Sequence, residues 1–250
     1  MTLQHKVAII TGANTGIGFA IAERLLRDHC GKFTVVLACR NLKRAENARE
    51  KLSEEFPGSD IEIVQADMES VSSVFRACDD IKKRFTRLDL LFCNAGILLN
   101  EGLRWGLILR KIFTDIVDLF ESDATIQRKG EMTADGLGKC FECNLFGHYL
   151  MLRELEDLLS ASDDGRVVWT SSMTSEKKSF SLDDFQGIRS DVPYESSKWA
   201  TDLVSVHVNE RLNPRHVRSF TTDPGVVASG IGNLAMWIVQ ARKVVHYIVS

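Results

Sequence analysis

In KVAIITGANTGIG, Lys6–Gly18, an apolar, β-branched run leads through a glycine-rich turn into a helical pattern, and this order is the strongest indication of the fold. Gly12 allows a tight turn, Gly16 lets a backbone approach a pyrophosphate, and Gly18 lets helix and strand pack closely. The N-terminus of the helix then presents N–H groups and a partial positive charge to phosphate. The stretch therefore predicts a dinucleotide-binding turn, whose contacts we assign to Gly12, Asn14, Thr15, Gly16, Ile17 and Gly18.

The rest of the chain alternates short apolar runs with longer amphipathic stretches. We expect strands at 6–10, 33–39, 61–66, 88–93, 166–171 and 218–223, and helices at about 17–29, 41–55, 70–84, 134–160 and 194–212. Most of the strand runs lack polar alternation, as is typical of strands buried on both faces. The pattern predicts an α/β fold in one domain, 1–250: a three-layer, doubly wound, Rossmann-type parallel sheet.

Two segments interrupt the alternation. Residues 98–133 form a long insert, and its part 103–121 has apolar residues at helical spacing, which predicts either a core-packing helix or a flap near the active site. The segment 231–250 is apolar but contains charged residues, which disfavours a membrane-spanning helix. An amphipathic helix at a membrane surface and a docked terminal helix remain its two alternatives.

Composition narrows the class of protein. The 250 residues carry a formal net charge of -3 and show no basic stripe, so no nucleic-acid partner is expected. Of the 6 cysteines only Cys140 and Cys143 form a C-x-x-C pair, and with His148 they lack a fourth ligand for zinc. We therefore expect no metal site, and free thiols in a reducing compartment. Neither a signal peptide nor an uninterrupted apolar run long enough for a transmembrane helix is expected.

The end of the second strand indicates which dinucleotide binds. A fold that takes NAD usually has an acid there for the ribose 2′-hydroxyl, but this chain has Cys39 and Arg40. A guanidinium can pair with a 2′-phosphate, and no carboxylate is expected to compete for it, so we predict NADP(H). Further cofactor contacts are assigned at the carboxyl ends of the next two strands: Asp67, Asn94, Ala95 and Gly96.

A second group of residues predicts oxidoreductase chemistry. Tyr194 and Lys198 lie one turn apart on a predicted helix, Ser172 follows the fifth strand, and Asn144 lies in the preceding helix. Reduction of a carbonyl needs a proton donor, and a nearby cation lowers the pKa of a tyrosine toward neutrality. We assign Tyr194 as the proton donor, Lys198 as the cation that tunes it and holds the cofactor, and Ser172 as a donor to the substrate oxygen. Asn144 would bind a water that links Lys198 to solvent.

These motifs together resemble the short-chain dehydrogenase/reductase family. The matching pieces are TGANTGIG, NAG, Asn144, Ser172, the Tyr194–Lys198 motif and PGVVAS after the sixth strand. The resemblance implies reduction or oxidation of an alcohol/carbonyl pair with a nicotinamide cofactor. It also implies that Pro224, Gly225 and Ser229 line the nicotinamide, with Ser229 at a position where the family usually has threonine.

Motifs outside the catalytic set, such as LACRNLKRAE, GEMTADGL and FSLDDFQ, resemble the 3-keto-steroid reductases of sterol biosynthesis, the 17β-hydroxysteroid dehydrogenase type 7 group. That likeness implies NADPH-dependent reduction of a 3-keto sterol to the 3β-hydroxy sterol, and also of estrone. It further implies work at the cytoplasmic face of the endoplasmic reticulum membrane, with a cytoplasmic location as the alternative. Peripheral membrane association and a homodimer are implied in the same way.

The chain ends soon after Gly225, so we expect it to lack the family's last strand. Two alternative functions stay open, the first because the catalytic residues do not distinguish substrates and the second because of this early end. One is reduction of another lipid carbonyl, such as retinal or a fatty aldehyde. The other is a truncated, non-catalytic protein that binds a nucleotide.

Overall fold

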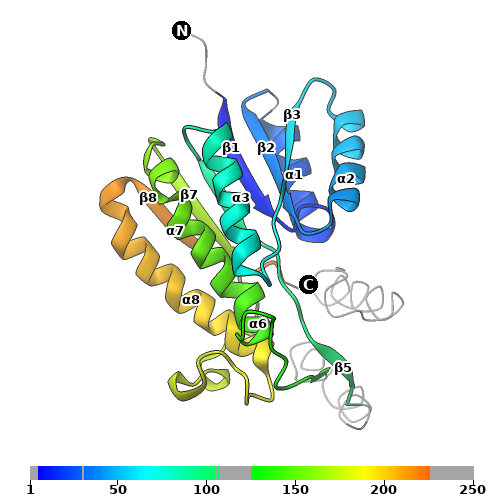
Figure 1. Cartoon of the computed structure of the whole chain (residues 1–250), viewed down its shortest axis with the longest axis vertical. Coiled ribbons are helices and arrows are strands. Elements are labelled where there is room, and N and C mark those ends of the chain that lie inside the picture. Colours follow the sequence, from blue (N-terminus) through cyan, green and yellow to red (C-terminus); the bar gives the residue numbers. More distant parts are fainter. Residues whose placement is uncertain (1–4, 30, 105, 107–124, 226–250) are drawn as a thin grey trace.

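The computed structural model describes residues 5–29, 31–104, 106 and 125–225. Its main sheet has six parallel strands in the order β3-β2-β1-β4-β7-β8 (Figure 1). The strands are β1 (Lys6–Thr11), β2 (Phe33–Cys39), β3 (Asp60–Gln65), β4 (Leu90–Cys93), β7 (Gly165–Thr170) and β8 (Val217–Thr222). All six predicted strands are confirmed, each within two residues at either end. Because the order reverses between β1 and β4, a ligand crevice is expected at their carboxyl ends.

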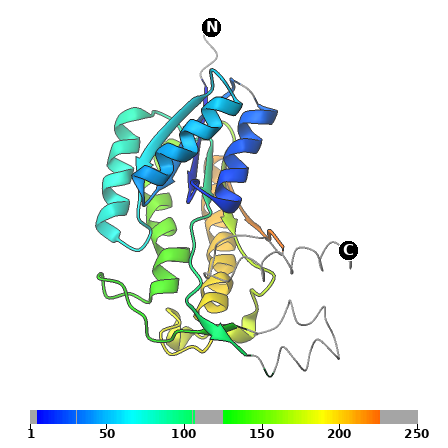
Figure 2. The same cartoon turned by 90° about the vertical axis from the view of Figure 1, so that its right-hand side faces the viewer.

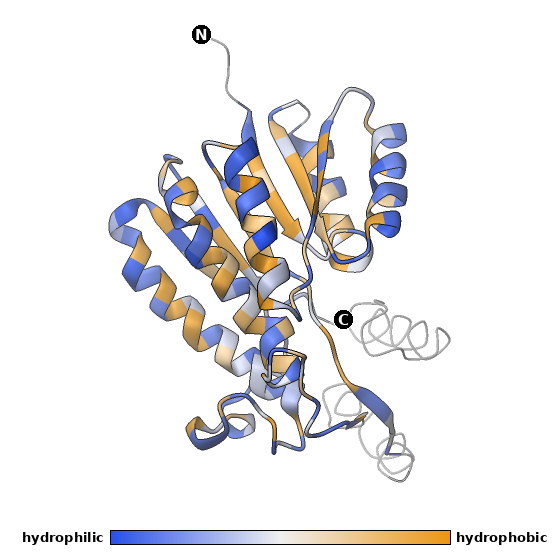
Figure 3. Ribbon diagram, viewed as in Figure 1, coloured by the Kyte–Doolittle hydropathy of each residue, from blue (hydrophilic) through white to orange (hydrophobic). Residues whose placement is uncertain are grey.

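Helices cover both faces of this sheet, as the doubly wound prediction requires (Figures 1 and 2). One face packs against α1 (Gly16–Asp28) and α2 (Leu42–Glu55). The other packs against α3 (Val71–Arg84), α7 (Gly147–Ser160) and α8 (Pro193–Leu212). Hydrophobic residues concentrate in the strands, whereas the helices turn hydrophilic residues outward (Figure 3).

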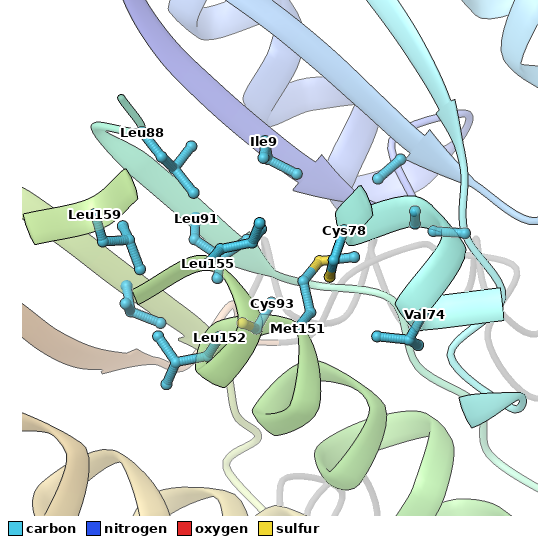
Figure 4. Close-up of a cluster of buried hydrophobic side chains, with 14 of the residues drawn as sticks. Ile9, Val74, Cys78, Leu88, Leu91, Cys93, Met151, Leu152, Leu155 and Leu159 are labelled. Atoms are coloured by element: carbon cyan, nitrogen blue, oxygen red, sulfur yellow. The ribbon is translucent and has the colours of Figure 1, made fainter. Parts of the chain in front are cut away.

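The apolar runs of the strands supply two cores at once. Along β1, Ala8 and Ile10 belong to the core beneath α1 and α2, whereas Val7 and Ile9 belong to the core beneath α3, α7 and α8. Successive side chains of a strand point to opposite faces, so a strand covered on both faces needs apolar residues throughout. Figure 4 shows the second core, where Ile9 lies among leucines of β4 and α7.

The helix predicted at 134–160 begins later and is not uniform. Residues up to Gly138 form turns, with Gly136 at a φ of 78° and an isolated bridge between Met132 and Gly138. A short helix α6 (Lys139–Phe141) then leads into a π-helical segment, Glu142–Phe146, and only afterwards into α7. Such π segments occur often at functional sites, and this one contains Asn144.

The insert at 98–133 contains two strands that the sequence did not predict. β5 (Asn100–Leu103) and β6 (Thr125–Gln127) pair antiparallel, with a register shift between Asn100 and Gly102. Strands of three or four residues with little apolar alternation carry almost no periodic signal. Most of the predicted insert helix, and the C-terminal segment 231–250, lie outside the described residues. Within the described part of the chain no helix is long and apolar enough to cross a membrane.

Candidate active site

The glycine-rich turn packs directly against the end of β4. Gly12 and Gly16 have positive φ angles of 67° and 57°, which favour glycine, and they shape the turn before α1. A Cβ atom at Gly18 would lie 2.6 Å from both the Asn94 side chain and the Gly12 carbonyl oxygen, and one at Gly12 would lie 3.1 Å from Ala95. The predicted strand–turn–helix arrangement is therefore confirmed, and its glycines allow the turn to approach the segment at 94–96.

The remaining residues of the turn leave the start of α1 open. Thr15 occupies the N-cap position of α1, but its side chain makes no capping hydrogen bond. Thr15 is exposed, whereas Asn14 and Ile17 are half-buried. The N–H groups at a helix start that lack a side-chain cap suit an anion, so this part of the site fits the pyrophosphate of a dinucleotide.

Thr11, at the end of β1, holds this edge together through its hydroxyl. The Thr11 hydroxyl oxygen accepts hydrogen bonds from the backbone N–H of Asn94 (2.8 Å) and of Ala95 (2.9 Å). It also lies 2.9 Å from His148 Nε2 and 3.1 Å from the Phe92 carbonyl oxygen. Sequence reasoning missed Thr11 altogether and weighed His148 only as a zinc ligand.

Four hydrogen-bonding groups surround the Thr11 hydroxyl, one of them on the ring of His148. A hydroxyl has two acceptor lone pairs and one proton, and here both lone pairs face backbone N–H donors. The hydroxyl proton is directed at the Phe92 carbonyl oxygen, 3.1 Å away, and His148 Nε2 lies at 2.9 Å. Burial and, to a smaller extent, the nearby charge of Lys198 lower the pKa of His148 to about 3. The imidazole is therefore neutral near pH 7.

Arg40 lies where the sequence predicted it, at the end of β2, but carboxylates do face it. Arg40 Nη1 lies 2.8 Å from Glu69 Oε1 and 3.9 Å from Asp67 Oδ1. Glu69 also approaches Lys139, with 3.6 Å between Nζ and Oε2. The expectation that no carboxylate competes for Arg40 is therefore wrong. The competing acid comes from the segment after β3, which only the folded sheet brings beside β2.

Hydrogen bonds within the turn after β3 hold Asp67 in place. Its carboxylate accepts the Glu69 backbone N–H at 3.1 Å, and its backbone N–H donates to the Ser73 hydroxyl at 3.0 Å. Together with Arg40, Arg76 and neighbouring polar residues it lines an open cavity of about 400 Å³. The carboxyl edge of β2 and β3 therefore offers a polar recess that contains two guanidinium groups.

Asn144 uses its side chain to join two neighbouring segments. Its Oδ1 accepts the Ile97 backbone N–H at 2.8 Å, and its Nδ2 donates to the Ile97 carbonyl oxygen at 3.1 Å and to the Ser197 hydroxyl at 2.9 Å. Gly96 permits this contact, because a Cβ there would lie 3.2 Å from Asn144 Oδ1. Both N–H groups of the amide are used, so a water at Asn144 would have to donate to one of its oxygens.

The N-terminal part of α8 meets the carboxyl end of β7. This contact brings Tyr194 and Lys198 close to Ser172. Lys198 Nζ donates to the Thr170 carbonyl oxygen at 2.7 Å and lies 5.4 Å from the centroid of the Tyr194 ring. Ser172 is half-buried, and its hydroxyl lies 3.0 Å from that of Thr174. A hydrogen bond between Ser172 and Tyr194 lowers the pKa of the phenol. The predicted convergence of these residues is what the fold produces.

The electrostatics of the pair differ from the prediction. Burial raises the pKa of Tyr194 to about 12, and the hydrogen bond with Ser172 offsets only part of that rise. Burial also lowers the pKa of Lys198 to about 8. Desolvation, which disfavours the charged form of either group, thus outweighs the lowering of the tyrosine pKa that we expected from the cation.

Pro224 and Gly225 follow β8 and are exposed. Gly225 has a φ of 66°, and its backbone N–H donates to the Asp223 carboxylate at 2.9 Å. The nearby charge of Asp223 raises the pKa of Tyr194, which places this turn near the phenol. Ser229 lies outside the described residues.

The Thr11 hydroxyl leads to a stability prediction. Thr11→Val keeps the shape of the side chain but leaves the buried N–H groups of Asn94 and Ala95, and His148 Nε2, without their partner. We expect the free energy of unfolding in urea to fall by roughly 2–4 kcal/mol. In Thr11→Ser, which retains the hydroxyl, the free energy of unfolding should fall by less than about 1 kcal/mol. Equal losses for the two variants would assign the effect to the methyl group instead.

Comparisons with known proteins agree with this geometry. The family model for short chain dehydrogenases matches residues 6–235. The chain is 41% identical over 230 residues to the 3-keto-steroid reductase/17-beta-hydroxysteroid dehydrogenase 7 of Rattus norvegicus, covering 91% of this chain and 69% of that protein. It is 34% identical over 259 residues to a 3-keto-steroid reductase of Schizosaccharomyces pombe, covering 98% of this chain and 75% of that protein.

Among solved structures, an alcohol dehydrogenase from the archaeon Thermococcus sibiricus, complexed with 5-hydroxy-NADP, is similar with a TM-score of 0.66 and 27% identity. The match covers 92% of this chain and 80% of that one. The resemblance drawn from the motifs is thereby confirmed over nearly the whole described sheet. The chain belongs to the short-chain dehydrogenase family of oxidoreductases.

Proposed function

We propose that this chain reduces the ketone of a 3-keto sterol to the 3β-hydroxyl, with NADPH as the hydride donor. The observation that carries the proposal is the group of Ser172, Tyr194 and Lys198 beside the glycine-rich turn, at the carboxyl edge of the sheet. The names of the relatives, 3-keto-steroid reductases that are 41% and 34% identical, support the substrate class. Because a sterol partitions into membranes, we place the activity at a membrane surface, the cytoplasmic face of the endoplasmic reticulum. Estrone is a further proposed substrate.

The residues of the site fit the cofactor. The positive-φ glycines leave the backbone of the turn free of side chains, and the open N-terminus of α1 suits the pyrophosphate. Arg40 is exposed at the end of β2, where a ribose 2′-phosphate would be paired. NADPH would supply the hydride. The similar alcohol dehydrogenase bound to 5-hydroxy-NADP supports the phosphorylated dinucleotide.

Protein groups would supply the proton and stabilise the developing charge. The high pKa of Tyr194 keeps its phenol protonated at neutral pH, as an acid must be, and the phenol donates its proton to the carbonyl oxygen as the carbon accepts hydride. Ser172 would donate a hydrogen bond to the same oxygen, where negative charge grows. The cation of Lys198 stabilises the tyrosinate that remains, and its hydrogen bond to the Thr170 carbonyl holds it in place.

Tyr194→Phe tests the proton donor. We expect kcat for reduction of a 3-keto sterol in detergent to fall by at least roughly 100-fold, because a general acid contributes about that much or more. The Kd for NADPH, followed by cofactor fluorescence, should stay within a factor of about two to three. Tyr149→Phe is the matched control, because the hydrogen bond described for that hydroxyl joins it to Arg153 within α7. Unchanged turnover of Tyr194→Phe would remove the tyrosine from the mechanism.

If the wild-type chain and Tyr194→Phe both bind NADPH but neither turns over, the non-catalytic nucleotide-binding alternative takes the place of the reductase. A panel of retinal, a fatty aldehyde and a 3-keto sterol separates the lipid substrates, which the catalytic residues do not distinguish.

The pKa of Lys198 predicts how activity depends on pH. Its value of about 8 in the free protein means that the cation is present below that pH and is lost as the pH rises through it. We therefore expect kcat/KM for NADPH, which reports groups of the free enzyme, to decline above about pH 8. In Lys198→Arg, which stays charged, the residual activity should lack this decline. The same alkaline limb in both proteins would assign the titration to another group.

Arg40→Asp tests the choice of dinucleotide. An acid at this position repels a 2′-phosphate and can accept a ribose hydroxyl, so the ratio of kcat/KM for NADPH to that for NADH should fall at least tenfold. Glu69→Gln should have the opposite effect, because it releases Arg40 from its carboxylate partner. Arg49→Asp, on the exposed face of α2, is the control for a change of net charge. Unaltered selectivity in Arg40→Asp would show that another residue reads the phosphate.

A further inference from the structure

The helix that carries Tyr194 and Lys198 starts without a cap of its own. The N-cap residue of α8 is Val192, whose side chain has no hydrogen-bonding group, and Pro193 has no backbone N–H. The first N–H groups of any helix lack partners within the helix. The backbone N–H of Tyr194 is one of these groups, and it must find an acceptor elsewhere in the fold.

That acceptor is Gln127 from the insert. Gln127 Oε1 accepts the Tyr194 backbone N–H at 3.0 Å, although 67 residues separate the two in sequence. Because a backbone N–H can only donate, the oxygen of the amide must face it, and the amide nitrogen must face the other way. There Nε2 donates to Glu195 Oε2 at 2.6 Å. Gln127 is only 5% exposed and Glu195 only 7%, so water does not replace these bonds cheaply.

The charge of Glu195 also acts on Tyr194. Its carboxylate lies in the first turn of α8, where the helix dipole favours a negative charge. That charge raises the pKa of the neighbouring Tyr194. One glutamine side chain therefore contacts both the backbone of the tyrosine and a charge that acts on its phenol.

The other end of the insert is tied to the site in a similar way. Ile97, just before β5, is held through its backbone N–H and carbonyl oxygen by the side chain of Asn144. β5 then pairs with β6, in a register that places Asn100 opposite Gln127. Through these hydrogen bonds and the β5–β6 pairing, the described ends of the insert connect Asn144 with the first turn of α8.

We propose that Gln127 is a positioning residue of the active site, which caps α8 from the insert and sets the location of Tyr194. The inference rests on the proposed function for its kinetic consequence, but not for the hydrogen bonds. Gln127 does not touch reacting atoms. It acts through Tyr194 and Glu195, so its loss should lower kcat and leave the binding of NADPH unchanged.

Gln127→Met is the first variant, because methionine has a similar length and no hydrogen-bonding group. We expect kcat to fall by roughly tenfold or more, since a small displacement of a catalytic group is costly. The Kd for NADPH should change by less than about twofold. Gln186→Met is the matched control: its amide oxygen also accepts a backbone N–H at 2.8 Å, but that N–H belongs to Gly138 and not to α8. The control should retain wild-type kcat.

A reversed pair separates the hydrogen bonds from simple packing. Gln127→Glu alone keeps an acceptor for the Tyr194 N–H but sets a second carboxylate against Glu195, so kcat should fall and recover partly as the pH is lowered and the pair shares a proton. Adding Glu195→Gln reverses the donor and the acceptor, and should restore kcat to within about threefold of wild type. A role in packing alone predicts no such rescue.

Hydrogen–deuterium exchange of peptides spanning 193–199 tests the cap without any turnover. The Tyr194 amide should exchange at least roughly tenfold faster in Gln127→Met than in wild type and in Gln186→Met. Wild-type exchange together with wild-type kcat would overturn the inference. Faster exchange with unchanged kcat in an active enzyme would reduce Gln127 to a structural cap and overturn its positioning role. If Tyr194→Phe keeps full activity, the proposed mechanism fails separately, whatever Gln127→Met does.

Discussion

The single hydroxyl of Thr11 links three parts of the molecule on which the site depends: the end of β1, the backbone after β4 and the helix α7. It lies at the point where the strand order reverses, one residue beyond the last pair of the β1–β4 ladder, Ile10 with Phe92. Two backbone N–H groups and one imidazole nitrogen meet one oxygen there. His148 is buried, and burial lowers its pKa, so the ring at this oxygen is neutral near pH 7. The segment after β4, which packs against the glycine-rich turn, is held from this point.

Burial governs the chemistry of the site more than pairing does. It raises the pKa of Tyr194 and lowers that of Lys198, so both shifts favour neutral groups in the free protein. For reduction this is a useful state of the tyrosine, because an acid must hold its proton until the substrate accepts it. The same desolvation makes Lys198 sensitive to pH near 8. The hydrogen bond with Ser172 orients the phenol, and the one to the Thr170 carbonyl oxygen orients Lys198.

Long-range contacts supply what the local motifs of the chain lack. Glu69 reaches Arg40 across the sheet edge, although the second strand itself ends without an acid. Gln127 reaches the start of α8 from the insert and replaces the cap that Val192 does not provide. Residues such as these carry no motif of their own. The sequence around Gln127 does not distinguish it from a polar loop residue, because its partner lies 67 residues away in the chain.

The sequence alone was enough to predict the layered fold and the six strands, and to propose Ser172, Tyr194 and Lys198 as the catalytic group. The reason is that buried parallel strands need unbroken apolar runs, and a phosphate-binding turn needs glycine at fixed spacings. Only the tertiary structure decided the pKa values, the partners of Arg40, the π-helical segment around Asn144 and the cap on α8. These depend on burial and on contacts between residues far apart in the chain, which no local pattern records.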